Sequence, residues 1–306
     1  MPSSLPLCGP AGWSYPHWQA AVYPRPRYRG FHPLEYLARF FDVVEINSSF
    51  YRPLRPELTR LWMSRVAHNP AFVFTAKLGR RFTHDRVLDG DEVAAFKDGL
   101  WPLLRAGKLG CLLMQFPWPF RFTAENREYF INLRRAFHEF PLAAEMRHSS
   151  WMLDEALGTF IDYRVGFCNI DQPEHMRAMP ATAFLTSGLA YFRFHGRNPA
   201  GWLEESEDRP RRSEGSNYLY TDAELAAWKE RILHVAGNAD SVFVTFTNDS
   251  GGKSVVNALQ LGRMLTARER GAPAALVARQ PLALEGFPAD RAFQGRLFPF
   301  DDSRAA

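Results

Sequence analysis

The chain has 306 residues, of which 46% are hydrophobic and 23% are charged, a composition typical of a globular protein with a sizeable core. No apolar run is long enough to cross a bilayer, so we expect no membrane-spanning segment. The net charge is +4 at neutral pH, and the basic residues, mostly arginine, are scattered along the chain. This charge predicts an ordinary solvated surface and leaves a nucleic-acid partner as an alternative.

The N-terminal residues MPSSLPLCGPAGW lack the charged head and the long apolar core of a secretory signal. We therefore expect a cytoplasmic protein. Three cysteines, Cys8, Cys111 and Cys168, follow no metal-binding spacing, and each lies in an apolar stretch. We expect reduced, buried thiols and no structural disulfide.

Eight short apolar segments predict eight strands. They lie at residues 7–12, 43–47, 72–77, 111–116, 142–147, 165–171, 190–196 and 241–249. Between most of them, apolar residues recur three and four positions apart, as at Leu34, Leu37 and Phe41, which predicts helices. A strand followed by a helix, eight times, predicts a single (β/α)8 TIM barrel over residues 1–265, with an open doubly wound sheet as the alternative.

Three further segments have their own signals. Thr221, followed three residues later by Glu224, predicts a capping box at the start of the helix that ends near Gly237. The stretch 196–218 is charged and rich in turn formers, which predicts a mobile loop after strand seven. Residues 266–306 lack clear periodicity and predict a C-terminal extension or tail.

The segment VVEIN places a glutamate inside an apolar strand. Because side chains alternate faces along a strand, Glu45 and Asn47 share one face, and Val44 and Ile46 share the other. We expect the apolar face to meet the helices and the polar face to point into the barrel. The same interpretation gives inward polar residues on six other strands: Thr75 with Lys77, Gln115, Glu145 with Arg147, Asn169 with Asp171, Arg193 with His195, and Thr247 with Asp249.

These polar side chains predict a site, because active sites of such barrels lie at the carboxyl ends of the strands. The structural alternative is a network of charges that neutralise one another in the core. In that case Glu45, Glu145, Asp171 and Asp249 would face Lys77, Arg147, Arg193 and His195.

Several motifs resemble the YecE-like family, a domain-of-unknown-function group with a TIM-barrel fold. They are GWSYPHW at 12–18, VEINSSFY at 44–51, FTAK at 74–77, THDR at 83–86, LMQFP at 113–117, EMRHSSW at 145–151, FRFHGR at 192–197 and TND at 247–249. The resemblance covers roughly residues 9–265 and implies the barrel fold but no activity. It points to motif positions without roles: Trp13, Glu45, Asn47, Lys77, Gln115, Glu145, Arg147, Asp171, Arg193, His195 and Arg197.

Two departures from the family pattern concern ligand contacts. Pro10 and Ala11 stand where relatives carry a serine or threonine before the first Gly-Trp pair, and Thr247 with Asn248 replaces the usual paired asparagines. We expect a hydroxyl or amide contact to the ligand to be missing or altered.

The polar residues support several chemistries. Glu145, Asp171, His195 and Asp249 end four successive strands, and such a ring of oxygen and imidazole ligands predicts a divalent metal ion. The bland alternative is that Arg147 and Arg193 neutralise these carboxylates. Without a metal, Glu45 and Glu145 predict an acid/base pair, with His195 transferring protons and Asp171 as a further catalytic candidate.

Substrate binding is predicted at the same end of the barrel. Lys77, Arg147 and Arg193 are expected to hold a substrate anion, and TNDSGGKS at 247–254 predicts either a phosphate cradle or a plain turn into a helix. Rim aromatics either stack on ligands or join loops to the barrel. The substrate-binding candidates are Trp13, Asn47, Tyr51, Lys77, Gln115, Arg147, Arg193, Arg197, Asn248 and Lys253.

Together these features predict an enzyme, a hydrolase or isomerase, that acts on a small polar or phosphorylated, sugar-like substrate by acid/base chemistry. A divalent metal ion is the cofactor that the carboxylates suggest. The alternative is a nucleic-acid-binding protein or phosphodiesterase resembling endonuclease-IV-like barrels, which would use the arginines and rim aromatics.

Overall fold

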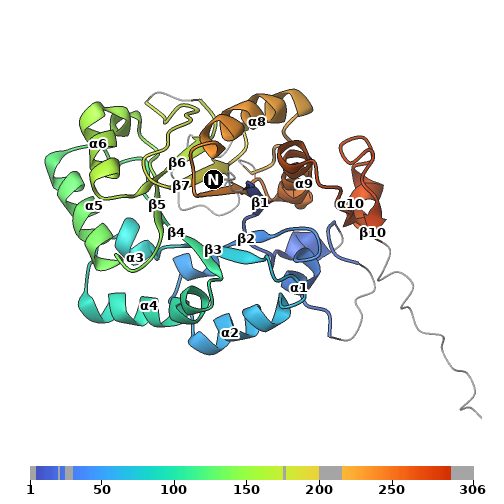
Figure 1. Ribbon diagram of the computed structural model, residues 1–306, viewed down its shortest axis with the longest axis horizontal. Helices are drawn as coiled ribbons and strands as arrows, with labels where there is room; N and C mark the ends of the chain where they lie inside the picture. Colours follow the sequence, from blue (N-terminus) through green and yellow to red (C-terminus); the bar gives the residue numbers. More distant parts are fainter. Residues whose placement is uncertain (1–4, 20, 25–29, 175–176, 200–215, 291–306) are drawn as a thin grey trace, which may run out of the picture.

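The computed structural model describes residues 5–19, 21–24, 30–174, 177–199 and 216–290. Its centre is a sheet of eight parallel strands in the order β1-β8-β7-β6-β5-β4-β3-β2. The strands are β1 (Leu7–Pro10), β2 (Val43–Ile46), β3 (Val73–Lys77), β4 (Leu109–Gln115), β5 (Leu142–Glu145), β6 (Gly166–Asp171), β7 (Leu189–Phe194) and β8 (Ser241–Phe246). They lie at the centre of the molecule, with helices around them (Figure 1).

The sheet curls until its two edge strands, β1 and β2, come together. The contact between them is a single parallel bridge between Ala11 and Glu45, and the Gly12 amide donates to the Glu45 carbonyl oxygen at 2.8 Å. A β-carbon on Gly9 would lie 2.0 Å from the carbonyl oxygen of Val43, so only glycine permits this approach. The sheet is therefore a nearly closed barrel, which confirms the predicted TIM-barrel fold.

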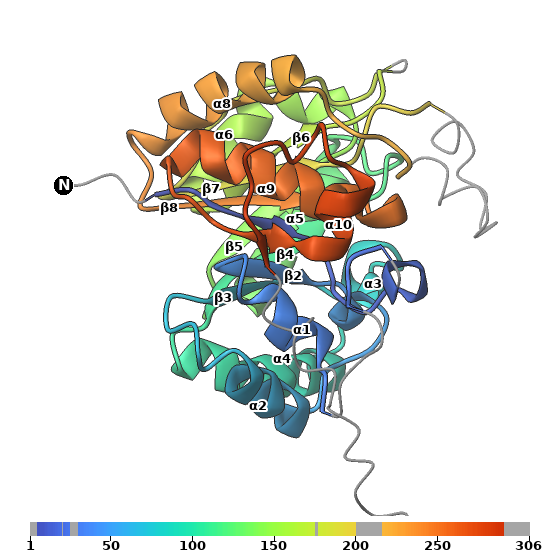
Figure 2. The same ribbon diagram turned by 90° about the vertical axis from the view of Figure 1, so that its right-hand side faces the viewer.

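Helices cover the outside of the barrel. They are α1 (Pro33–Leu37), α2 (Pro56–Arg65), α3 (Arg80–Thr83), α4 (Gly90–Arg105), α5 (Ala124–Ala136), α6 (Asp154–Asp162), α8 (Asp222–Ala236) and α9 (Lys253–Thr266), with 3-10 turns η1 (Pro16–Gln19), η2 (Ser48–Phe50), η3 (Ser149–Met152) and η4 (Ser250–Gly252). Figure 2 shows the strands between α6, α8 and α9 on one side and α1, α2 and α4 on the other. The capping box predicted at Thr221 and Glu224 starts α8. Aromatic side chains fill this layer, as where Phe194 of β7 packs against Trp228 of α8.

One connection differs from the predicted alternation of strands and helices. Between β6 and β7 the described residues, 172–174 and 177–188, form no helix. The Asn169 side chain holds this connection: its Oδ1 accepts from Thr182 Oγ1 at 2.8 Å and from the Phe184 amide at 2.7 Å. A side chain of β6 thus bonds to the connection outside the barrel, where a helix would otherwise cover the strand.

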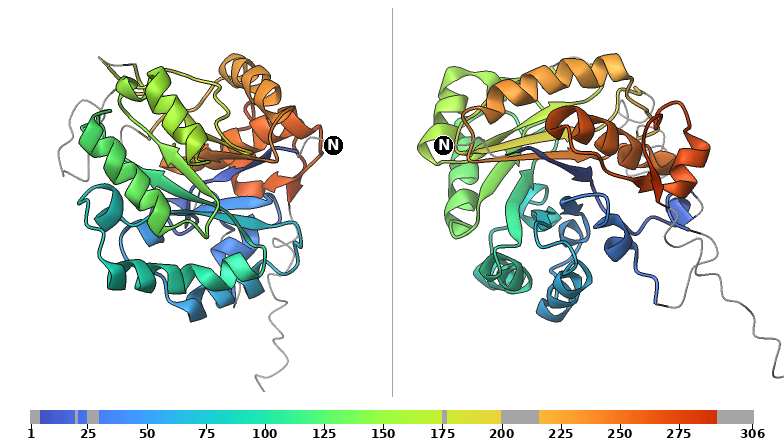
Figure 3. Two further views of the ribbon diagram at one scale, coloured as in Figure 1. Left: turned by 60° about the vertical axis from the view of Figure 1, so that its left-hand side comes forward. Right: turned by 45° about the vertical axis from the view of Figure 1, so that its right-hand side comes forward.

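The chain after α9 packs on the barrel as far as residue 290. Strand β9 (Ala272–Pro273), helix α10 (Ala274–Arg279) and strand β10 (Ala289–Asp290) form a small unit beside α9, as both views of Figure 3 show. Leu276, Leu284 and Phe287 are buried in it. Residues 291–306 of the predicted tail, and residues 200–215 of the predicted mobile loop, lie outside the described residues.

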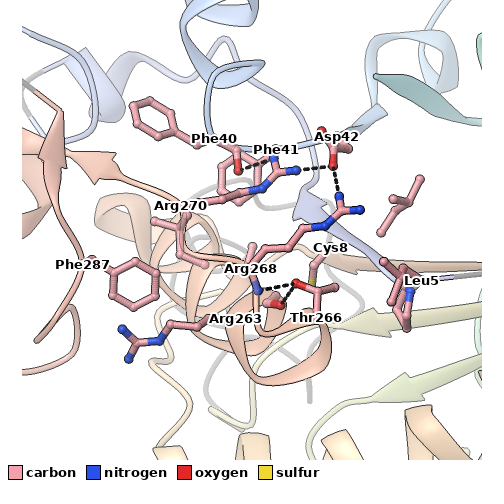
Figure 4. A pocket seen from close by; sticks show the side chains of 15 residues that line it. Leu5, Cys8, Phe40, Phe41, Asp42, Arg263, Thr266, Arg268, Arg270 and Phe287 are labelled. Carbon is pink, nitrogen blue, oxygen red and sulfur yellow. Dashed lines mark hydrogen bonds and ion pairs between the residues drawn. The ribbon is translucent and has the colours of Figure 1, made fainter. Parts of the chain in front are cut away.

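Arginines of the segment that follows α9 join the C-terminal part to the chain before β2. Figure 4 shows Arg268 and Arg270 pointing at Asp42, beside the start of β1. Arg270 also donates to the carbonyl oxygen of Phe40 at 3.1 Å. The segment therefore closes the outside of the seam between β1 and β2.

Candidate functional site

The centre of the barrel holds an ion pair between β2 and β7. Arg193 donates from Nε to Glu45 Oε2 at 3.0 Å and from Nη2 to Glu45 Oε1 at 2.8 Å, and both residues are buried. This two-pronged geometry is the strongest arrangement of an arginine and a carboxylate. The Glu45 carboxylate also accepts from Tyr191 Oη at 2.8 Å and from Thr245 Oγ1 at 3.2 Å.

The same arginine binds a second glutamate. Arg193 Nη1 donates to Glu145 Oε2 at 2.8 Å and to Gln115 Oε1 at 3.2 Å, and Arg147 Nε donates to the other oxygen of Glu145. Burial alone would raise the pKa of Glu145, but the charges of Arg147 and Arg193 outweigh burial and hold this pKa well below its usual value. Glu145 is therefore an ionised carboxylate at neutral pH.

His195 lies at the edge of this group as a neutral ring. Its Nδ1 is 2.8 Å from Thr247 Oγ1, and its Nε2 is 3.2 Å from Glu145 Oε1. Burial, followed by the charge of Arg147, lowers the pKa of His195 to about 3 despite the nearby carboxylate. The imidazole is therefore uncharged at neutral pH. We call Glu45, Gln115, Glu145, Arg147, Arg193 and His195 the inner cluster.

Lys77 lies beside the inner cluster but is held differently. Thr75, two residues earlier on β3, contacts Tyr191 Oη at 2.9 Å inside the barrel, so Lys77 shares the inward face. Its Nζ lies 4.2 Å from the centre of the Phe50 ring, and the side chain is partly exposed. Among the described residues, no carboxylate oxygen lies within 4.0 Å of this nitrogen.

The pKa of Lys77 is lowered to about 7, first by burial and then by the charge of Arg193, while Glu45 and Glu145 act in the opposite direction. Half of the molecules thus carry a neutral amine near neutral pH. The neighbouring arginines keep their proton throughout the physiological range, and His195 is neutral there.

Asp171 is not where the alternation predicted it. Its carboxylate faces the helix layer, where Trp228 Nε1 donates at 2.6 Å and Tyr220 Oη at 2.8 Å, and Arg197 binds both oxygens. Cys168, on the opposite face of β6, is the residue that points inward. Burial raises the pKa of its thiol, the charge of Glu145 raises it further, and the charge of Arg193 acts in the opposite direction. The expected inward direction of Asp171 is therefore wrong, and Arg197, a predicted substrate-binding residue, binds its carboxylate.

The predicted metal ring does not assemble. Asp171 points away from Glu145 and His195, and Asp249 lies by the first loop, with Oδ2 3.7 Å from His17 Nε2. Over the residues that the structure describes, no three His, Cys, Asp or Glu side chains are grouped so that they could hold a metal ion. The side chains present do not fit the predicted divalent cation, because Glu145 and His195 alone remain together.

Two side chains of the predicted phosphate cradle take part in hydrogen bonds with neighbouring residues. Asn248 Nδ2 donates to the Tyr218 carbonyl oxygen at 2.7 Å and to Asn257 Oδ1 at 2.9 Å, away from the barrel mouth. Lys253 Nζ donates to Asn217 Oδ1 at 2.5 Å. Neither side chain belongs to the inner cluster.

The remaining predicted binding residues lie on the first two loops. Trp13 is buried edge-on against Trp62, with ring centres 4.9 Å apart, so it joins its loop to the barrel. Asn47 donates to Tyr15 Oη at 3.2 Å. Tyr51 packs on Phe50 yet is 75% exposed, which leaves its ring open to solvent.

Sequence reasoning missed two residues of the site, Tyr191 and Thr245. Both side chains donate a hydrogen bond to the Glu45 carboxylate. The signal was present, because Tyr191 precedes Arg193 by two positions and Thr245 precedes Thr247 by two, so each shares an inward face.

A cavity lies at the amino-terminal end of the strands, opposite the inner cluster (Figure 4). It has a volume of about 40 Å³ and is lined by the start of β1, the residues before β2 and the end of α9. Its charged groups, Asp42 with Arg268 and Arg270, are paired with one another. We interpret it as a packing gap beside the seam of the barrel.

Comparison with known proteins agrees with this architecture. The family model described as "Protein of unknown function DUF72" matches residues 7–281. The UPF0759 protein YunF of Bacillus subtilis is 28% identical over 260 residues, which cover 80% of this chain and 90% of YunF. In the described residues, no helix combines the length and apolar character needed to span a membrane.

Two solved structures share the fold. A DUF72 family protein from Thermotoga maritima is 28% identical, with a TM-score of 0.74 over 86% of this chain and 99% of that one. A DUF72 family protein from Enterococcus faecalis is 27% identical, with a TM-score of 0.74 over 85% of this chain and 95% of that one. The chain belongs to the DUF72 family.

Proposed function

We propose that this protein is an enzyme that acts on a small anionic substrate at the carboxyl end of its barrel, with Lys77 as the group that accepts and returns a proton. The supporting observation is the state of Lys77, an amine in the barrel with a pKa of about 7. A base works best when its pKa lies near the working pH. Isomerisation and hydrolysis, the two predicted reaction classes, both use such a group.

Of the predicted glutamate bases, Glu145 is poorly suited to this task, and Glu45 is bound at both oxygens by Arg193. Arg193 binds both Glu45 and Glu145, and Arg147 adds a second cation to Glu145. A carboxylate that two cations stabilise takes up a proton only at low pH. His195 is also a weak base at neutral pH, because its ring takes up a proton only when the pH approaches about 3. The chemistry we propose is therefore acid/base work without a metal, centred on Lys77.

The charges around Lys77 favour an anionic substrate. The two glutamates and the two arginines of the inner cluster balance each other, so a protonated Lys77 is an excess positive charge in a site of low dielectric. A carboxylate or phosphate of a substrate would balance it. Such a ligand would be small and polar, as the sequence predicted.

The protonation of Lys77 can be measured directly. The chain has five lysines, Lys77, Lys97, Lys108, Lys229 and Lys253, so protein labelled with ¹³C at the lysine ε-carbon gives five NMR signals. We expect one signal, absent from Lys77→Met, to titrate near pH 7 and the other four near pH 10. Titration of all five signals near pH 10 would refute the proposed role of Lys77.

The same signals report the substrate class. A bound anion stabilises the protonated amine, so acetate or inorganic phosphate should raise the pKa of Lys77 and leave the other four lysines unchanged. Acetamide, a neutral analogue of acetate that forms no imine, is the matched control. Equal shifts with acetamide and acetate would contradict an anionic substrate.

A nucleic-acid partner stays a prediction of the sequence, and the exposed ring of Tyr51 is the observation that favours it. Bases stack on such rings with little regard to sequence. Binding of a single-stranded oligonucleotide that weakens steeply with salt, and that Tyr51→Ala reduces, would support this alternative.

A further inference from the structure

We infer that Lys77 is a nucleophile that forms an imine with a small carbonyl compound carrying a carboxylate or phosphate group. The inference rests on the proposed function and names its substrate class. Four features of the described structure carry it: the environment of the amine, its accessibility, the cations around it, and the use of lysine in this chain.

Among the described residues, no carboxylate pairs with the Lys77 amine and so holds it in the protonated form. Of the described lysines, Lys97 pairs with Glu139 at 2.7 Å, and Lys108 donates to the Pro70 carbonyl oxygen at 2.6 Å. Lys77 instead lies over the face of Phe50, which excludes water from one side of the nitrogen and offers it no acceptor oxygen. Desolvation beside other cations is the setting in which a lysine becomes a nucleophile.

Lys77 is also reachable from solution. The Glu45 and Glu145 side chains have no exposed surface, whereas the Lys77 side chain is partly exposed at the end of β3. Its backbone is fixed, because Ser49 Oγ donates to the Lys77 carbonyl oxygen at 2.7 Å. Lys77 is thus less buried than Glu45 and Glu145 and lies at the carboxyl end of its strand.

The inner cluster suits the charges that imine formation creates. When Nζ attacks the carbonyl carbon, a C–N bond forms and the carbonyl π electrons move to oxygen, which Arg147 and Arg193 stabilise electrostatically. The oxygen takes the proton that the nitrogen releases. With a further proton from solvent it leaves as water, and the nitrogen electron pair completes the C=N bond.

The product is an iminium cation, and its charge selects the substrate. Amine, carbonyl compound and one proton give iminium and water, so the product carries a positive charge as long as its nitrogen keeps its proton. The arginines of the inner cluster already balance its glutamates, and the iminium is left to pair with an anionic group of the substrate itself. A carbonyl compound without such a group lacks this balance.

The use of lysine in this chain points the same way. Five of its 37 basic residues are lysine, and the other inward cations of the barrel, Arg147 and Arg193, are arginines. A guanidinium serves wherever only charge and hydrogen bonds are needed. A primary amine is required where a bond to carbon forms.

The test is reductive trapping. The protein is incubated near pH 7 with glyoxylate, pyruvate or dihydroxyacetone phosphate, together with cyanoborohydride, which reduces an iminium to a stable secondary amine. Acetone and dihydroxyacetone are the neutral controls. We expect one adduct per chain, located at Lys77 by peptide mass spectrometry, and trapping roughly tenfold faster with the anionic compounds, a factor that corresponds to about 1.4 kcal/mol. The carboxylate and phosphate arms show which anion the site prefers.

Variants complete the test. Lys77→Arg keeps the charge but cannot form the imine, so its adduct should disappear, whereas Lys108→Arg should trap as well as the unaltered chain. Adducts spread over the other four lysines of the unaltered protein would overturn the inference, whether or not Lys77→Arg folds. If Lys77 titrates near pH 7 but traps nothing, the imine is wrong and its role as a base stands; titration with the other lysines removes the proposed function itself.

Discussion

Arg193 decides the chemistry of its neighbours. A single guanidinium joins β2, β4 and β5 through Glu45, Gln115 and Glu145, and its own pKa rises well above the usual value because the glutamate charges outweigh the cost of burial. Of the two carboxylates that look like an acid/base pair in the sequence, Glu145 is thereby fixed in the ionised form, and both oxygens of Glu45 are bound by Arg193. The variable proton of the site belongs to Lys77.

The lowered pKa of Lys77 makes a prediction for stability. Between about pH 7 and about pH 10 the unfolded chain holds a proton on Lys77 that the folded chain has released, so unfolding takes up a proton and folding stability rises with pH. We expect the free energy of unfolding, measured by urea denaturation, to rise over this range by on the order of 1 kcal/mol per pH unit relative to Lys77→Met.

Lys229→Met is the control for this measurement, because its side chain lies on the outer surface of α8 and should show no such pH dependence. A constant difference in stability between the unaltered protein and Lys77→Met across the range would show that the amine keeps its proton when folded.

At the scale of the elements, alternation predicted the inward residues where one face of the strand is clearly apolar. VVEIN on β2 and AYFRFHG on β7 gave Glu45, Arg193 and His195 correctly as inward residues. On β6 the same reasoning failed. Both faces of this strand are buried, so its inward Cys168 is less polar than its outward Asp171, and polarity no longer marks the side that faces the barrel.

The described residues between β6 and β7 form no helix, and this explains why polar residues of β6 face outward. A helix would cover β6 with apolar side chains, whereas the irregular connection brings backbone groups that need partners. Asn169 meets two of these needs, at the amide and the carbonyl oxygen of Phe184, and its Oδ1 also accepts from the side chain of Thr182. No pattern in a single sequence reveals that a strand side chain bonds to an irregular connection where a helix was expected.

Asn169 should therefore be important for stability. Asn169→Ala removes the partners of buried polar groups, and we expect a loss of about 2 kcal/mol or more in the free energy of unfolding. Asn238→Ala, at an exposed position after α8, should change this free energy little. Equal effects of the two substitutions in urea denaturation would mean that the connection is held by other contacts.

At the scale of the whole molecule, the seam between β1 and β2 is the weakest part of the barrel. The two strands share one bridge, while β7 and β8 pair over six positions. The pair of Arg270 with Asp42 and the Phe40 carbonyl supports the seam from outside. The sequence predicted the barrel but gave no sign of this support, because it depends on residues more than two hundred positions apart.

Removal of this support should loosen the seam alone. In Arg270→Met we expect backbone amides of β1 and β2 to exchange with deuterium several-fold faster, while β4 to β7 keep their rates. Arg268→Met is the matched variant, because Arg268 Nη1 lies 3.7 Å from Asp42 Oδ2 and its side chain is 52% exposed, so a smaller effect is expected. Uniform acceleration across all strands would show that the seam does not open independently.

The pairing of the first strand with the last determines when the site can exist during synthesis. Leu7 pairs with Phe243, so β1 cannot form its ladder of hydrogen bonds until β8 has left the ribosome. Glu45 contributes to the closure of the barrel in two ways. Its backbone bridges to Ala11, and its side chain binds Arg193 of β7. A nascent chain that stops before β7 therefore lacks Arg193, so that Glu45 is without this partner and Glu145 has Arg147 but not Arg193. The long separation of these contacts makes closure slow, and incomplete chains expose the unpaired strand edges that molecular chaperones bind.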